Sequence, residues 1–142
     1  MKILDTRIGF FSMLIALFLI GFNACQKEVP SNDLTVDIIG AYNGEYREGD
    51  ENFTVIVSNV VATASRNSDN TFGMEMELVP GVFTVPFTAE MQSKTAFTVN
   101  PFDLDGDSLE GEGTLEGNLL KIFFFEAGTS KPYGSYIAQK QS

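Results

Sequence analysis

Apolar and polar residues alternate with a period of two along most of the chain after residue 37, and turn-forming residues interrupt the alternation at short intervals. The clearest run spans residues 71–78, where apolar side chains at even positions oppose threonine, glycine and glutamate at odd positions. Alternation of this kind is typical of strands that bury one face of an antiparallel sheet. The pattern predicts about eight strands, at residues 37–47, 53–64, 71–78, 83–87, 94–99, 110–116, 119–125 and 133–140.

Short turns connect these runs. The turn residues are Gly49-Asp50, Asn67 to Asn70, Pro80-Gly81 and Gly117-Asn118. Because such turns leave no room for a crossover helix, we expect an all-β, antiparallel up-and-down meander that forms a small barrel or a flattened barrel. Pro86 cannot donate a backbone hydrogen bond, so it predicts an edge or a bulge in the fourth strand.

A different pattern precedes the strands. Lys2 and Arg7 are followed by an apolar run, residues 8–22, which ends just before Ala24-Cys25. A basic start, an apolar core of roughly 15 residues and a small residue before the cut define an export signal, too short for a comfortable membrane span. Cys25 is the only cysteine, so no intramolecular disulfide is expected.

The segment Phe22 to Cys25, followed by a short polar stretch, resembles the lipobox of bacterial lipoproteins in the looser form of Bacteroidetes-type proteins. The resemblance implies that residues 1–24 are a cleaved signal peptide. Cys25 would carry acyl chains such as palmitate and hold the protein in a bacterial membrane, the outer membrane, on its periplasmic or surface face. Residues 25–36 would form the lipidated N-terminus and a tether, and residues 37–142 the barrel domain. An uncleaved N-terminal anchor, or an ordinary signal peptide with a chance cysteine, is the alternative.

Two glycine-rich stretches, Gly40 to Gly44 and Gly111 to Leu119, resemble those of small lipocalin-like barrel lipoproteins. This resemblance implies a lipocalin-like barrel. A ligand-binding calyx in it would be lined by the apolar residues of the first, third and fourth strands. These candidate ligand-lining residues are Tyr42, Phe72, Met74, Met76 and Phe83.

The amino-acid composition limits the ligands and the types of catalysis that this chain can support. The net charge of −10 disfavours binding to nucleic acid or to anionic headgroups. The chain has no histidine, which excludes His-dependent nucleophilic catalysis and His-ligated zinc. We therefore expect no enzymatic activity and no cofactor. Paired glutamates, Glu110 with Glu112 and Glu75 with Glu77, leave a carboxylate-dependent hydrolase as a third hypothesis, although they fit the wet face of a strand better.

Asp103, Asp105 and Asp107 concentrate oxygen ligands in one loop, as calcium requires. The spacing is not that of an EF-hand, and no helices flank it. A solvated acidic turn is the favoured interpretation, and a metal site is the weaker one.

The run from Leu119 to Phe125 is apolar at both parities, so a strand cannot bury all of it on one face. If Gly117-Asn118 forms a two-residue turn, the even positions 120, 122 and 124 face the interior. Phe123 and Phe125 then form an outer patch, which is covered by another part of the chain or binds a partner.

Taken together, these features favour a lipid-anchored, non-enzymatic binding or structural module of the cell envelope, with the membrane and an envelope protein as partners. A lipocalin-like carrier of a small apolar ligand is the alternative.

Overall fold

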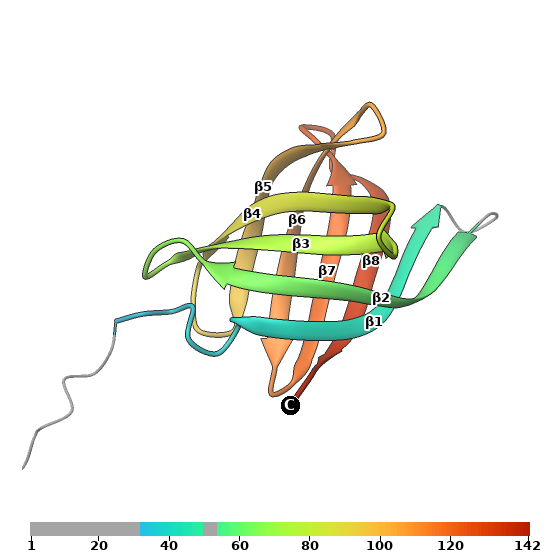
Figure 1. The fold of residues 1–142 in the computed structure, drawn as a ribbon. Coiled ribbons are helices and arrows are strands. Elements are labelled where there is room, and N and C mark those ends of the chain that lie inside the picture. Colours follow the sequence, from blue (N-terminus) through green and yellow to red (C-terminus); the bar gives the residue numbers. More distant parts are fainter. Residues whose placement is uncertain (1–31, 50–53) are drawn as a thin grey trace, which may run out of the picture. The chain divides into compact units, whose positions relative to one another are not determined.

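The computed structural model describes residues 32–49 and 54–142. Eight antiparallel strands follow one another around a closed barrel, in which each strand pairs with the next and the last pairs with the first (Figure 1). The strands are β1 (Gly40–Gly49), β2 (Thr54–Arg66), β3 (Thr71–Val79), β4 (Phe83–Met91), β5 (Ala96–Leu104), β6 (Asp107–Glu116), β7 (Leu119–Glu126) and β8 (Lys131–Lys140). The predicted all-β up-and-down barrel is confirmed. Within the described ranges, no helix has the length and apolar character needed to cross a membrane.

The alternating strand directions give the barrel two distinct ends. The described chain begins at Asn32 and finishes at Ser142 at one end, which also holds the turns after β2, β4 and β6 (Figure 1). We call this the entry end. The turns after β3, β5 and β7 lie at the other end, the far end.

Inward side chains fill the barrel. Phe72 and Phe97 meet edge to face with their ring centroids 5.1 Å apart, a favourable aromatic geometry. The buried tyrosine hydroxyls also have partners, since Tyr42 donates to the carbonyl of Ile38 at 2.6 Å. The largest fully buried side chains are Tyr42, Tyr46, Tyr136, Phe72, Phe97, Phe124, Ile38, Met74, Met76, Leu109, Leu120 and Ile122.

Two glycines on β6 make room for this packing. A Cβ atom on Gly113 would lie 2.2 Å from Cζ of Phe97, and one on Gly111 would lie 2.5 Å from the carbonyl oxygen of Phe123. Real Cβ atoms do not approach other atoms so closely, because cores are packed near crystal density. Gly113 is therefore needed for the ring of Phe97 to fit inside, and Gly111 for the backbone of β7 to lie close to β6.

A bulge in β2 changes which residues face inward. Gly44 pairs with Val60 and Glu45 pairs with Ser58, so Asn59 is an extra residue in β2. Its φ of 59° lies in the left-handed region that asparagine tolerates better than most residues. Because of the extra residue, the inward positions shift from Val60 to Val57 across the bulge.

The segment before β1 packs against the entry end. Thr35 and Ile38 are fully buried, and the amide of Leu34 donates to the carbonyl of Asp69 in the β2–β3 turn at 2.7 Å. We predicted that residues 25–36 form the lipidated N-terminus and a tether. Their described part from residue 33 onward instead belongs to the folded unit.

β4 and β5 pair over only part of their length. The three residue pairs are Ala89 with Val99, Glu90 with Thr98 and Met91 with Phe97, all near the entry end. Towards the far end the two strands separate, which we call the β4–β5 seam. The ring of Phe102 fills it, with centroids 5.2 Å from Phe87 and 5.7 Å from Phe124.

Pro86 lies on β4 beside this seam and pairs only with Glu75 of β3. The predicted edge at Pro86 is thus present as a local edge within a closed barrel. The prediction that the fifth strand ends at Asn100-Pro101 was wrong, because β5 continues to Leu104 after a shift in its register with β6 between Val99 and Phe102.

Candidate functional site

The β6–β7 hairpin has the register that its turn predicted. Leu115 pairs with Leu120 and Glu116 pairs with Leu119. The φ of 62° at Gly117 fits the first central position of a two-residue hairpin turn. The even positions of β7 are buried, whereas Phe123 is 44% exposed and Phe125 is partly exposed.

Each outward ring of β7 has a carboxylate beside it. Phe123 pairs with Glu112, and Phe125 pairs with Glu110. Directly opposed residues of an antiparallel pair project from the same face. The outer surface of β6 and β7 therefore presents two phenylalanine–glutamate pairs in a row.

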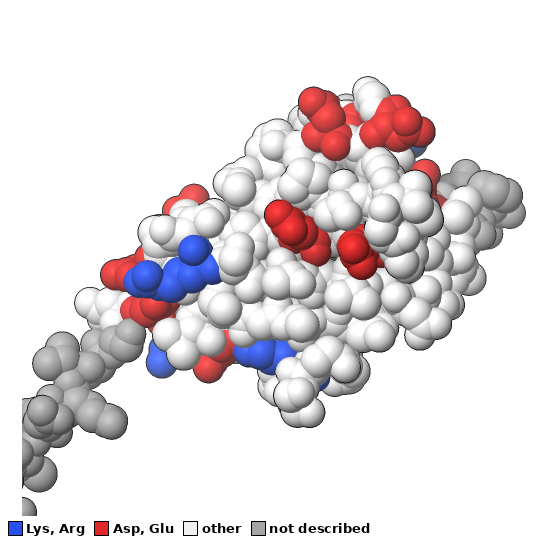
Figure 2. Space-filling view, viewed as in Figure 1, with Lys and Arg blue, Asp and Glu red and all other residues white. Residues whose placement is uncertain are grey.

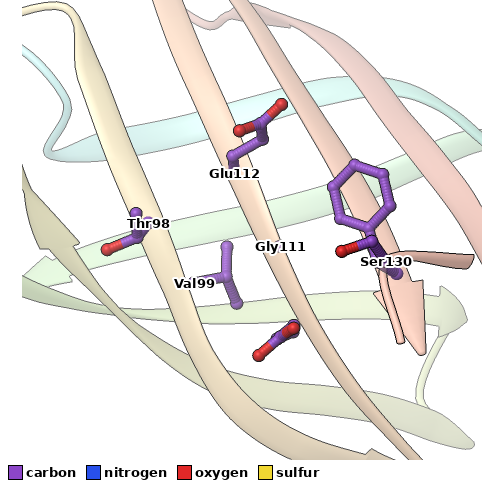
Figure 3. A pocket seen from close by; sticks show the side chains of 7 residues that line it. Thr98, Val99, Gly111, Glu112 and Ser130 are labelled. Carbon is purple, nitrogen blue, oxygen red and sulfur yellow. The ribbon is translucent and has the colours of Figure 1, made fainter. Parts of the chain in front are cut away.

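Two adjoining hollows lie along these pairs. The first has a volume of about 440 Å³ and the second about 340 Å³. Thr98 and Glu112 line both, so the two form one surface, which we call the outer groove. Figure 3 shows the first hollow, with Thr98 on β5, Glu112 on β6 and Ser130 from the turn after β7. The other lining residues of the groove are Gln92, Ala96, Phe97, Val99, Glu110, Gly111, Gly113, Thr114, Phe123 and Phe125.

The charge of the outer groove is negative. Glu110 accepts a hydrogen bond from the amide of Gly128 at 3.1 Å, and Glu112 has no hydrogen-bond or ion-pair partner within the described residues. Lys121, on the same outer face, is paired with Glu116 at 3.0 Å. The groove thus presents carboxylates that no described lysine or arginine neutralises.

Charge is also distributed unevenly between the two ends of the barrel. Most described cations lie at the entry end, namely Arg66, Lys94, Lys121 and Lys140. The far end has only Arg47 and Lys131 as described cations, and its carboxylates are Glu48, Asp103, Asp105, Asp107 and Glu126. The carboxylates of the entry end, in contrast, lie among its four cations, and they are Asp33, Asp37, Asp69, Glu90 and Glu116. In Figure 2, red carboxylates lie at the upper edge and over β3, and the largest blue patch lies at the left with further red atoms beside it. The far end is therefore the more acidic of the two.

A small polar cluster closes the far end. Tyr46 donates to one oxygen of Glu48 at 3.0 Å, and Tyr133 donates to the other oxygen at 3.2 Å. Burial, followed by the charge of Glu48, raises the pKa of Tyr133 to about 12 and raises that of Tyr46 further. No sequence pattern pointed to this cluster, because its members come from β1 and β8.

Four of the five candidate ligand-lining residues lie in the filled interior. Tyr42, Phe72, Met74 and Met76 are buried there among other side chains. The fifth was placed wrongly, since Phe83 is 41% exposed at the start of β4. The register of β3 and β4 shifts between Glu77 and Val79, next to the turn, which leaves Phe83 at the rim of the barrel.

The acidic residues lie at and beside a tight turn, as in the favoured interpretation, and not in a loop that could enclose a metal ion. Asp105 and Gly106, with φ values of 52° and 94°, form a tight two-residue turn, while Leu104 pairs with Asp107 and Asp103 pairs with Ser108. Asp103 and Asp107 therefore project from opposite faces of the sheet and do not converge on Asp105. Within residues 32–49 and 54–142, no three acidic or cysteine side chains come close enough to hold one metal ion.

Cys25 and Asp50 lie outside the described residues, so acylation at Cys25 and the Gly49-Asp50 turn stay predictions.

Sequence reasoning placed Phe123 and Phe125 on the outer patch but missed the lining residues Thr98 and Ser130. A usable signal for the tight turn was present in Asp105-Gly106, which is a strong hairpin dipeptide between two strand-like runs.

No protein-family model and no curated protein matches the chain. One similar solved structure is a "putative outer membrane protein" from Bacteroides fragilis, with 13% identity and a TM-score of 0.50, over 77% of this chain and 53% of that one. The chain thus spans about half the length of that protein. Another is EF1p2_mFAP2b bound to DFHBI, with 12% identity and a TM-score of 0.49, over 78% of this chain and 99% of that one. At such low identity, the similarity to the Bacteroides protein shows a shared fold.

Proposed function

We propose that this protein is a lipid-anchored, non-enzymatic binding module of the bacterial cell envelope that holds a partner protein in the outer groove. The observation behind the proposal is the exposed ring of Phe123 and the partly exposed ring of Phe125, which lie along two adjoining hollows on the outside of a filled barrel. Exposed aromatic surface next to a concavity is typical of binding sites.

The proposed location at the cell envelope rests on Cys25 and on the resemblance of the surrounding sequence to a lipobox. Six residues lie between Cys25 and Asn32, and the seven Cα–Cα steps that join the two residues reach at most about 25 Å when extended. An anchor at Cys25 would therefore keep Asn32 within about 25 Å of the acylated residue. The fold shared with a bacterial protein named as an outer membrane protein supports this proposed location at the cell envelope.

Replacing Cys25 with serine tests the anchor. We expect the Cys25→Ser protein to partition into the aqueous phase of a detergent extraction, whereas the unaltered chain enters the detergent phase. Mass spectrometry of the unaltered chain should show a mature N-terminus at Cys25 with acyl chains. Recovery of the variant in the detergent phase with its leader intact would contradict the lipoprotein assignment.

Site-specific photocrosslinking tests the binding face. A photoreactive residue in place of Phe123 should give a discrete adduct in intact membranes of the source bacterium. The same residue in place of Ile137, which is similarly exposed at 42% on β8, serves as the control. Equal adducts at both positions, or none at position 123, would contradict binding in the outer groove.

The β4–β5 seam favours a second candidate function, the carriage of a small apolar ligand. Phe102 is only partly buried, yet its ring separates Phe87 and Phe124 from solvent in the gap between the two strands. Removing this ring would open a path to the interior. The neutral fluorescent probe N-phenyl-1-naphthylamine should then bind Phe102→Ala more strongly than the unaltered protein. Absence of probe binding to both proteins would exclude the carrier function.

A further inference from the structure

The outer groove combines aromatic rings with carboxylates in a repeating arrangement. We infer that it binds a basic, extended segment of the partner protein, in which lysine or arginine side chains alternate with other residues. This inference rests on the proposed function, because it specifies the partner for the same groove.

The chemistry of each pair suits a cation. A lysine ammonium or an arginine guanidinium is attracted to the face of an aromatic ring and forms charge-assisted hydrogen bonds with a carboxylate. Phe123 with Glu112, and Phe125 with Glu110, offer both features side by side on one face. A ring alone would accept any apolar group, and a carboxylate alone would attract any cation. The two together favour a side chain that has both an apolar stem and a charged end, as lysine and arginine do.

The spacing of the two pairs suits an extended chain. Residues two apart on a strand project from the same face about 7 Å apart. The same distance separates side chains i and i+2 of an extended peptide. A segment that runs along the groove can therefore place one cation at each pair, with the hydroxyls of Thr98 and Ser130 at the edges of the first hollow available for hydrogen bonds.

The surrounding charge excludes other occupants of the same face. Lys121 is engaged by Glu116, and Lys131 is engaged by Glu126 at 2.5 Å, so the groove glutamates stay without a described cation. A second copy of this chain, with its net charge of −10, an acidic peptide and an anionic lipid surface would all be repelled. Charge complementarity therefore selects a basic segment.

The test uses the full-length protein in detergent and fluorescein-labelled nonapeptides, with binding followed by fluorescence anisotropy at 150 mM salt. One peptide alternates lysine with threonine, a second replaces lysine by glutamine, and a third has the same lysines in one block. We expect the alternating lysine peptide to bind at least tenfold more tightly than the glutamine peptide and several-fold more tightly than the block peptide.

Two double variants separate site binding from general charge attraction. Glu110→Gln with Glu112→Gln should weaken binding of the alternating peptide at least tenfold. The matched control, Glu75→Gln with Glu77→Gln, removes the same charge from β3 and should weaken binding less than twofold. Equal losses in the two double variants, or equal binding of the lysine and glutamine peptides, would overturn the inference.

The variant Phe123→Ser distinguishes failure of this inference from failure of the proposed function. If it abolishes peptide binding while the β6 double variant has no effect, the groove binds a partner but does not select cations. If the crosslink at position 123 joins two copies of this chain, the occupant is a second copy and the inference is wrong. If no peptide binds and no crosslink forms, both proposals fail.

Discussion

Phe123 and Phe124 are neighbours in the chain with opposite surroundings. Phe124 is 1% exposed and packs against the rings of Phe87 and Phe102, whereas Phe123 is 44% exposed beside Glu112. The alternation of a strand alone accounts for this contrast. Substitution at these two positions therefore separates the contribution to the core from the contribution to the groove.

Phe124→Ser should destabilise the protein by roughly 2–4 kcal/mol more than Phe123→Ser, because only the former leaves a buried cavity and an unpaired hydroxyl. Urea melts of the two variants followed by circular dichroism measure the difference. If Phe123→Ser proves the more damaging change, the outward orientation of its ring is wrong.

Gly113→Ala should be among the most damaging single-methyl additions in the barrel. The new Cβ would lie 2.2 Å from Cζ of Phe97 and 2.8 Å from the backbone oxygen of Lys121. Overpacking of this kind costs typically 1–3 kcal/mol, which calorimetry detects as a lower Tm. Gly73→Ala on β3 is the matched control, since its nearest neighbour would be the Ser65 hydroxyl at 3.5 Å. A similar loss in both variants would show that strand propensity, not the Phe97 contact, determines the effect.

At the scale of the strand, most of the fold could be predicted because its signals are local. Alternation within each run and the turn residues Asn67 to Asn70, Pro80-Gly81 and Gly117-Asn118 identify eight strands and their order. The errors fall where pairing with a distant strand decides the outcome. β5 passes through Pro101 because β6 continues beside it, and the bulge at Asn59 depends on the pairing of β1 with β2.

The sequence predicted the residues that β7 contributes to the outer groove but not those that β5 contributes. A two-residue turn fixes the parity of β7, so Phe123 and Phe125 could be placed on the outside from the sequence. The groove itself needs β5, whose Thr98 reaches the same surface as Glu112. Thr98 lies opposite Glu112 because β5 pairs with β6, and this register depends on the irregularity between Val99 and Phe102, which the sequence pattern did not predict.

The segment before β1, residues 33–39, is attached to the barrel partly through the charge of Asp33. Asp33 accepts hydrogen bonds from the amide and hydroxyl of Thr35 and from Nε of Arg66. These bonds, those from Thr35 first, lower the pKa of Asp33 below its usual value near 3.8. The ionised carboxylate therefore favours the docked segment above that pH, and the benefit is lost as pH falls through the lowered pKa.

Asp33→Asn should speed hydrogen exchange at the amide of Leu34, which bonds to Asp69, without changing exchange in β7. The difference from the unaltered protein should hold at pH 6, begin to shrink below the ordinary carboxyl value near 3.8, and vanish as pH falls through the lowered pKa of Asp33. NMR-detected exchange at several pH values measures this. Asp37→Asn, an exposed change in the same segment, is the control. Faster exchange in both variants to the same extent would rule out a specific role for Asp33.

At the scale of the molecule, the barrel contains every tyrosine of the chain. Burial, the largest cause for all four, raises the pKa of Tyr42 and Tyr133 to about 12 and that of Tyr46 and Tyr136 further. Tyr136, for example, is fully buried and donates to the carbonyl of Val60 at 2.9 Å. The folded state therefore keeps protons that the unfolded chain releases near pH 10.

Stability should be constant up to about pH 10 and then fall, because the unfolded state binds fewer protons than the folded one. Each buried tyrosine contributes a slope of up to roughly 1.4 kcal/mol per pH unit. Guanidinium melts from pH 8 to 12, with phenolate absorbance recorded in parallel, measure the effect. We expect phenolate absorbance and loss of the barrel to appear together. Phenolate absorbance near pH 10 in an intact barrel would contradict the burial of these side chains.

The pairing of β1 with β8 differs from every other pairing in the described barrel, since all the rest join consecutive strands. Hairpins form quickly from local contacts, whereas joining residues 40–49 to residues 131–140 must close nearly the whole domain into a ring. We expect the pairing of β1 with β8 to form last and slowly. Until it forms, the unpaired edges of these two strands are available to another copy of the chain. The two strands approach each other closely, because a Cβ on Gly44 would lie 2.1 Å from the carbonyl oxygen of Ile137 and one on Gly134 would lie 2.5 Å from that of Arg47. Larger residues at these two glycines would slow the pairing of β1 with β8. Size-exclusion chromatography of refolded variants would then show domain-swapped dimers.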